Sequence, residues 1–393
     1  MIARTLLRYP DDYGKELYAH TVLTATEANG TLVDERRGSK ENGMSRTLSS
    51  MIPVTEGKLM AWWNHEEQET PCLMLTTPPE PQEPVDDLDD YWFNVDGVLR
   101  RAMREIETRQ YYGVALPYHW PDWGAATFAG MLGAPMQAVD ARTFWAASSC
   151  PTLGAVLDVG HDEQSRFART VWEVTRRSVA MSRDHHFVAS YPIVGIADTL
   201  ASLYGTVPLL LAMVEQPEAV HAAMQHLTRL WLREFDRVET IIESAGNQGN
   251  MNWMGIWAPG RTCATQEDYS CMISDDMFRE FCLPPLVDLI DSLDYAMYHL
   301  DGPDAISHVD TLLGIRNLRA IQWIPGAGNE DMRRWYELLR HILSHGKSVQ
   351  VNARVEEIDE LVSAVGPKGL MITNRSVTGE QAEDLLSRYP QDR

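Results

Sequence analysis

The last third of the sequence alternates between short apolar runs and helix-like segments, and this alternation constrains the fold more than any other feature. The repeat returns roughly every 20 to 28 residues, as expected for strand–helix units of a parallel sheet. The expected strands are 295–301, 319–325, 348–353 and 369–374, and the helix-like segments after them are 304–314, 330–345, 355–366 and 378–388.

Four further apolar runs extend the same alternation towards the N-terminus. They are 71–77, 112–118, 186–192 and 252–259, and long helical patterns separate them. Eight strand–helix units in one chain predict a single-domain α/β fold, a (β/α)8 TIM barrel over 44–393. A doubly wound open sheet is the alternative that the same pattern allows.

Residues 1–43 differ from the rest of the chain. They are polar, contain glycine and lack a sustained periodicity, so we expect a loosely ordered N-terminal extension. Met44 follows directly and is an alternative start. The start of the chain has no apolar core or cleavage site of a signal peptide.

The net charge and the cysteines indicate which kinds of partner and which cellular compartment to expect. The formal net charge is −22, and an acidic surface repels phosphate backbones, so nucleic acid is not an expected partner. No run approaches the roughly 18 apolar residues of a membrane span, so no membrane is expected. The five cysteines form no regular pairs, which indicates a reduced, cytoplasmic protein.

A histidine and an aspartate lie two residues apart where one expected strand ends. In an extended strand these positions share a face, so His299 and Asp301 point the same way, and Gly302-Pro303 then ends the strand. We interpret the pair as a catalytic unit that moves a proton or binds a metal. Alternatively, Asp301 caps the helix that follows.

Other polar and aromatic residues follow the remaining expected strands. In a barrel these ends face the active site, so we expect them to bind substrate. An amide and an indole suit orientation of a small organic ligand, and Arg375 suits an anionic group, although simple packing or a surface arginine explains them as well. The residues are His119, Trp120, Tyr191, Trp257, Gln322, Trp323, Asn352, Asn374 and Arg375.

Three stretches resemble the uroporphyrinogen decarboxylase (URO-D) superfamily. "YHLDGPDAISHVDTLLGIRNLRAIQWIPGAG" is the strongest, and the similarity is closest to a branch described as decarboxylase-like or methyltransferase-like. "IADTLASLYGTVPLLLAMVEQPEAV" is similar to the family's Asp-x-Leu-Ala helix and its turns, and "QEDYSCMISDDMFREFCLPPL" to its Asp-aromatic-Ser motif. The resemblance covers roughly residues 50 to 390 and implies a (β/α)8 barrel.

The resemblance implies one of two chemistries. The decarboxylases carry an N-terminal Arg-Gln-Ala-Gly-Arg-Tyr signature, which is absent here, where the matching zone reads "AWWNHEEQETPCLMLTTP". The methyltransferases bind zinc through a His-x-Cys pair and a further Cys near the last strand. This chain has His299-Leu300-Asp301, and its last strand ends "MITNRSV" without Cys, although zinc also accepts N and O ligands.

We therefore expect an enzyme that acts on a small molecule at the carboxyl ends of the strands, most simply a methyltransferase. The resemblance implies Zn²⁺, held by His299 and Asp301, and a corrinoid carried by a partner protein. A homodimer is a further expectation. The alternatives are a cofactor-free carboxy-lyase, in which His299, Asp301 and Arg375 handle protons and a carboxylate, and a non-catalytic ligand-binding barrel.

The expected extension yields a first prediction. A chain that starts at Met44 should be soluble, and its thermal midpoint should lie within a few degrees of that of the full chain, because 1–43 carries no periodic apolar face to bury. Differential scanning calorimetry of both chains measures this. Insoluble truncated protein would show that 1–43 completes the core.

Overall fold

A computed structural model describes residues 47–82, 84–142, 144–191 and 195–391, and the expected extension 1–43 lies outside them. Within these ranges the largest sheet has the order β2-β1-β13-β12-β11-β10-β9. All its neighbours are parallel except β2, which is antiparallel to β1. The strands are β1 (Cys72–Thr76), β2 (Tyr111–Gly113), β9 (Thr262–Gln266), β10 (Tyr295–Asp301), β11 (Leu318–Ile324), β12 (Ser348–Asn352) and β13 (Leu370–Asn374).

Three short pairs of strands complete the described β structure. β3 (Tyr118–His119) and β6 (Phe187–Val188) are parallel. Two antiparallel pairs join β4 (Met136–Ala138) to β5 (Phe144–Ala146), and β7 (Asn250–Met251) to β8 (Trp257–Ala258).

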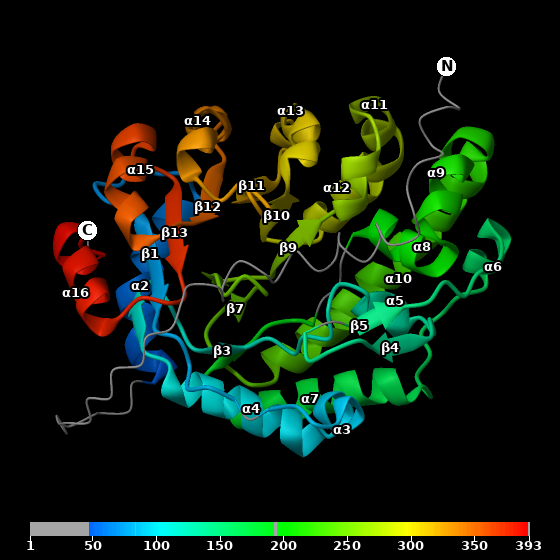
Figure 1. The fold of residues 1–393 in the computed structure, drawn as a ribbon, viewed down its shortest axis with the longest axis horizontal. Helices are drawn as coiled ribbons and strands as arrows, with labels where there is room; N and C mark the ends of the chain where they lie inside the picture. The colour runs from blue at the N-terminus through cyan, green and yellow to red at the C-terminus, as the bar shows by residue number, and fades with distance from the viewer. Residues whose placement is uncertain (1–46, 83, 143, 192–194, 392–393) are drawn as a thin grey trace.

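Helices surround these strands (Figure 1). In the view of Figure 1, α12 to α15 follow one another along one side of the main sheet, and α4 and α7 lie on the opposite side of the molecule, beyond β3. The α-helices are α2 (Leu48–Trp63), α3 (Leu88–Phe93), α4 (Val95–Thr108), α5 (Thr127–Met131), α6 (Leu153–Leu157), α7 (Arg166–Ser182), α8 (Ile196–Tyr204), α9 (Thr206–Glu215), α10 (Pro217–Glu243), α11 (Asp275–Met277), α12 (Leu283–Asp291), α13 (Val309–Leu313), α14 (Tyr336–Ser344), α15 (Ile358–Val365) and α16 (Gly379–Arg388). Short 3₁₀ or π turns are η4 (Asp268–Met272), η5 (Phe278–Cys282), η6 (Pro303–His308), η7 (Met332–Trp335) and η8 (Val355–Glu357).

The expected parallel α/β arrangement is confirmed, and its C-terminal third matches closely. The strand expected at 295–301 is β10, and the next three expected strands are β11, β12 and β13 with ends shifted by one residue or none. Their order in the sheet follows their order in the chain. Each is buried on both faces, which is why the apolar runs were continuous.

Two earlier strand predictions need correction. Residues 112–118 divide into the end of β2 and the start of β3, and Gly113, with a φ of +64°, lies where β2 ends. Residues 252–259 do not form a parallel strand: the Asn252 side-chain oxygen accepts bonds from the backbone N–H groups of Met254 and Ile256, which bends the chain between β7 and β8. The parallel strand is β9, a few residues later.

The two faces of the main sheet pack against different partners. Alternate residues such as Leu300 and Trp323 belong to the large core shared with the outer helices. The intervening residues, Met297 and Ala320 among them, belong to a second core that includes residues of α2 and β8. This second face is the one that carries His299, two residues beyond Met297.

The packing of β10 yields a second prediction. Leu300→Ala should lower the free energy of unfolding by about 2–5 kcal/mol, because Leu300 is 1% exposed and its removal leaves a cavity under α-helices. Leu211→Ala on α9 is the matched control, since Leu211 is 50% exposed. Urea unfolding measures both, and an equal loss in the two variants would contradict the assigned face of β10.

Candidate functional site

Three side chains that offer metal-ligand atoms converge where β9 and β10 end. One atom each from Asp268, His299 and Asp301 lies within 4.8 Å of the others. The strand register explains the cluster: His299 pairs with Gln266 across β9 and β10. Asp301 and Asp268 each lie two residues further along, on η4 in the second case, so both carboxylates sit on the same face above that pair.

Gln322 fixes the orientation of the His299 imidazole. The Gln322 side-chain oxygen forms a short hydrogen bond with Nδ1 of His299. An amide oxygen only accepts, so Nδ1 carries the proton and Nε2 carries the lone pair. His299 is buried, and its Nε2 has no hydrogen-bond partner among the described residues. A buried nitrogen without a partner is costly, so this lone pair is available to a water molecule, an ion or a ligand.

The imidazole is held neutral. Burial lowers the pKa of His299, while Asp301 and the bond to Gln322 oppose this effect. The His299 and Trp253 rings also pack in a T-shaped contact, with ring centroids 5.4 Å apart. A neutral imidazole with a free Nε2 is the form that binds a metal ion or accepts a proton.

Asp268 lies in a crowded acidic environment. Burial, with repulsion from Asp198, Asp301 and Glu267, raises its pKa well above the usual range. Its Oδ2 accepts a 2.8 Å bond from the side-chain nitrogen of Gln266. Carboxyl groups gathered in this way either keep a proton or gain a cation between them.

Two buried acids next to the cluster, Glu267 and Asp198, fix the position of Asp268. Each accepts backbone hydrogen bonds from the segment that carries the other. The Glu267 carboxylate accepts bonds from the first N–H groups of α8, Ile196 at 2.9 Å and Ala197 at 3.0 Å. In return, the Asp198 carboxylate of α8 accepts bonds from the backbone N–H groups of Asp268 at 3.1 Å and Tyr269 at 2.7 Å. Burial raises the pKa of Asp198 to about 6, and these bonds oppose the rise.

A row of polar side chains crosses four neighbouring strands below the carboxylates. Gln266, His299, Gln322 and Gln350 are successive partners in the register. We call them the polar layer. All four are buried, and Gln350 donates a 2.8 Å bond to the Thr373 hydroxyl on β13. The polar layer therefore runs from the carboxylate cluster to the start of a neighbouring cavity.

That cavity has a volume of about 430 Å³ and lies beside the carboxylate cluster rather than on it. Its wall combines arginines with aromatic rings and includes the ends of β1 and β13. The wall includes Thr76, Arg101, Arg109, Tyr118, Trp120 and Arg375. Trp120 joins the two places, because its ring stacks on Trp253 at 5.2 Å and Trp253 contacts His299.

The structure brings some of the expected site residues together. His299 and Asp301 lie in the carboxylate cluster, and Gln322 orients His299. Trp120 and Arg375 line the cavity. The alternative role of Asp301 as a helix cap finds no support, because the cap of η6 is Gly302 and no side chain bonds to that helix end.

Other expected binding residues have structural partners instead. Trp323 alternates with Gln322, so it faces the helices, where its ring packs on Trp335 at 4.9 Å. The Tyr191 hydroxyl accepts a bond from Trp172, and Trp257 donates to the backbone of Gln248, both within the cores.

The remaining strand-end residues differ in exposure. His119 lines the cavity wall, but its Nδ1 forms a 2.7 Å bond with the Ser178 hydroxyl on α7. Asn374 donates to the carbonyl of Ala353. Asn352 is exposed at the end of β12.

Asp268 is the functional candidate that was not among the expected site residues, although it is the first residue of the Asp-aromatic-Ser motif. It follows β9, and β9 was not predicted because its sequence, Thr-Cys-Ala-Thr-Gln, lacks a long apolar run. Once that strand is placed, the polar pair Gln266 and Asp268 repeats the two-residue spacing of His299 and Asp301. Arg101 and Arg109 were missed for another reason: they belong to α4 and its C-terminal cap, not to a strand end.

Comparison with models of protein families and with curated proteins finds no match to this chain. Among the described residues, no single helix is long and apolar enough to cross a membrane. The pair α8 and α9 reaches that length and composition only together, and it is bent by 108°.

His119 yields a third prediction, on pH. Burial lowers its pKa from 6.5 to about 4, so below pH 6.5 the unfolded chain takes up a proton that the folded chain refuses. Stability must then fall as the pH drops, by about 2 kcal/mol at pH 5 from this residue alone. Urea unfolding at pH 7 and pH 5 should give a smaller difference for His119→Gln than for the wild type. Equal differences would mean that His119 is not held neutral.

Proposed function

We propose that the chain is a (β/α)8-barrel enzyme of the URO-D superfamily that binds a divalent metal ion and transfers a methyl group. The strand order supports the barrel, because β1 pairs with β13 and thus joins the first and last parallel strands of the sheet. The parallel strands β3 and β6 form a separate pair, and in a barrel they would stand between β1 and β9 and bring the number of parallel strands to eight.

The observation that carries the proposal is the free Nε2 of His299 beside two carboxylates. Asp268, His299 and Asp301 would hold the ion. The bond from Nδ1 to Gln322 is the outer contact that a metal-binding histidine usually makes, and Gln266 does the same for Asp268. One imidazole and two carboxylates fit Zn²⁺ and other divalent ions that accept N and O ligands.

The donor set differs from the thiolate site of the family's methyltransferases. Cys271 on η4 is close enough to feel the charges of Asp268 and Asp301, but burial and these charges raise its pKa to about 12. Cys271 also lies outside the group of three residues whose ligand atoms converge. We propose that the N and O donors replace the sulfur ligands.

A divalent ion in this place would lower the pKa of a nucleophilic group bound to it, which prepares the acceptor for a methyl group. The chain's own part is to hold that acceptor and exclude water. The methyl donor would be a corrinoid on a partner protein, for which the partly exposed Asp268 and Asp301 mark the side of approach.

A carboxy-lyase is the second candidate, and the raised pKa of Asp268 favours it. A carboxyl group that holds its proton more tightly than usual could protonate the carbanion left when a substrate loses CO₂. The arginines of the neighbouring cavity would then hold the substrate carboxylate.

The metal site yields a fourth prediction. Protein purified without chelators should contain about one divalent ion per chain, and Asp301→Asn should weaken its affinity by about 100-fold or more, because it removes a charged ligand. Competition with a chromophoric chelator measures the affinity. Asp276→Asn on α11 is the matched control, since Asp276 is exposed and outside the cluster.

Two results would contradict the metal-dependent proposal. One is metal affinity that Asp301→Asn and Asp268→Asn leave unchanged. The other is full turnover with CO₂ release by chelator-treated protein, which would establish the carboxy-lyase instead. Under either chemistry, Asp301→Asn should lower turnover by about 100-fold.

A further inference from the structure

We propose that the cavity beside the carboxylate cluster binds an organic carboxylate with a flat, apolar body, and that Arg375 and Arg101 recognise its charge. The binding stands on the geometry of the cavity. The further step, that this carboxylate is the substrate, rests on the function proposed above.

Charge in the cavity is opposite in sign to that of the whole protein. The chain has a net charge of −22, yet the cavity wall contains four arginines and only two acids. The arginines are Arg101, Arg109, Arg142 and Arg375, and the acids are Glu105 and Asp122. A basic pocket in an acidic protein selects for a small anion and against large polyanions, which the outer surface repels.

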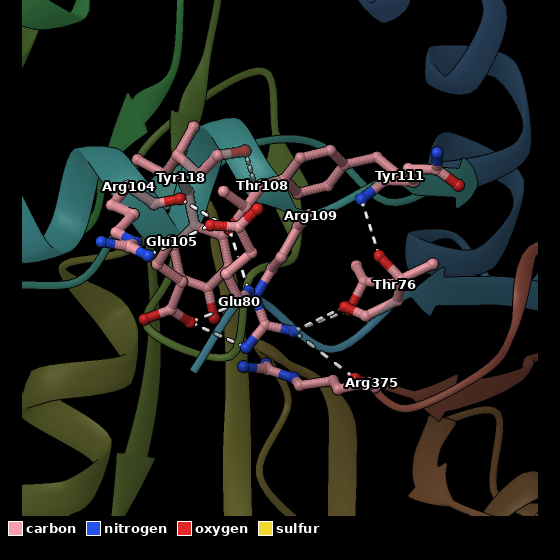
Figure 2. Close-up of polar contacts among 12 residues, drawn as sticks. Thr76, Glu80, Arg104, Glu105, Thr108, Arg109, Tyr111, Tyr118 and Arg375 are labelled. Atoms are coloured by element: carbon pink, nitrogen blue, oxygen red, sulfur yellow. Dashed lines mark hydrogen bonds and ion pairs between the residues drawn. The ribbon is translucent and has the colours of Figure 1, made fainter. Parts of the chain in front are cut away.

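Arg109 is a brace rather than a ligand-binding group. It forms two bonds with one oxygen of Glu105, at 3.1 Å and 2.7 Å, so its charge is already balanced. Its other nitrogen donates to the Thr76 hydroxyl at 3.2 Å and to the backbone oxygen of Arg375 at 3.4 Å. Figure 2 shows Arg109 between these partners, where it holds the segment after β13 against the end of β1.

Arg375 and Arg101 have no ion pair with any carboxylate of the described chain. The Arg375 side chain donates to the backbone oxygen of Met254 at 2.9 Å and lies 5.9 Å from the centre of the Tyr118 ring. Arg101 donates to the backbone oxygen of Tyr91 and lies 3.9 Å over its ring. These contacts aim both guanidinium groups without balancing their charge, which leaves them for a carboxylate.

The aromatic wall supplies the apolar part of the site. Trp92 and Trp123 contribute to the cavity wall, and their indole nitrogens are already bonded to the backbone oxygens of Asp140 and Trp92, so these side chains offer the cavity apolar surface. A volume of about 430 Å³ lies in the usual range for a small organic ligand.

The cavity is also connected with the carboxylate cluster. Trp120 in its wall stacks on Trp253, which packs on His299. Thr373, also in the wall, accepts a bond from Gln350 of the polar layer. A carboxylate held by Arg375 would thus place the rest of the ligand along the ends of the strands that carry the metal ligands.

The fifth prediction tests binding without relying on turnover. Benzoate should bind to metal-free protein with a dissociation constant of about 1 mM or tighter, and neutral benzamide should bind at least about tenfold more weakly. Isothermal titration calorimetry, with quenching of tryptophan fluorescence as a second readout, measures both. Arg375→Gln and Arg101→Gln should each weaken benzoate binding about tenfold or more, whereas Arg375→Lys should retain part of it.

An exposed arginine on the same helix as Arg101 provides the matched control. Arg104→Gln should leave the affinity unchanged, because Arg104 is exposed on α4 and pairs with Glu80. Equal binding of benzoate and benzamide, no benzoate binding at 20 times the expected constant of about 1 mM, or wild-type affinity in folded Arg375→Gln would overturn the proposal. Tighter binding of inorganic phosphate than of benzoate would also overturn it, in favour of a phosphate site.

The metal site and the anion site can fail separately. Asp301→Asn should keep the benzoate affinity of the wild type, since Asp301 is not in the cavity wall. Benzoate binding without any metal binding would leave the cavity proposal standing and remove the metal-dependent function. Metal binding without benzoate binding would do the reverse.

Discussion

The hydrogen bond between Nδ1 of His299 and the side-chain oxygen of Gln322 is the interaction on which the candidate site depends. It selects one tautomer and turns the other ring nitrogen towards the carboxylates. With this bond in place, Nε2 has no partner among the described residues, and the proposed metal site depends on that observation.

Burying several carboxyl groups around this histidine is energetically unfavourable, and backbone hydrogen bonds to two of them oppose this effect. Burial raises the pKa of Glu267 well above its usual range, with Asp198 adding to the rise, yet bonds from the first N–H groups of α8 oppose it. Such crossed capping holds Asp268 in place without using its carboxylate. We propose that the cluster receives a cation, while the neighbouring cavity, which is rich in arginine, receives an anion.

Much of this arrangement could be predicted from the sequence, and the exceptions have physical causes. The pairing of His299 with Asp301 followed from the two-residue period of a strand, and β10 has the expected bounds. Asp268 could not be placed because β9 has little apolar character and an Asn252 turn interrupts the run before it. The partners of Tyr191 and Trp257 lie on elements far away in sequence, so their burial within the cores could not be recognised from strand ends alone.

The cavity is built from both ends of the described chain, because β1 pairs with β13. Thr76 and Arg375 are brought together by Arg109, yet they are separated by nearly the whole described chain. A nascent chain that has not yet extended past Leu370 has every aromatic residue of the cavity wall but no strand to place Arg375 beside Arg109. The proposed recognition of a carboxylate therefore requires the sheet to be complete from β1 to β13, because a chain that ends before β13 lacks Arg375.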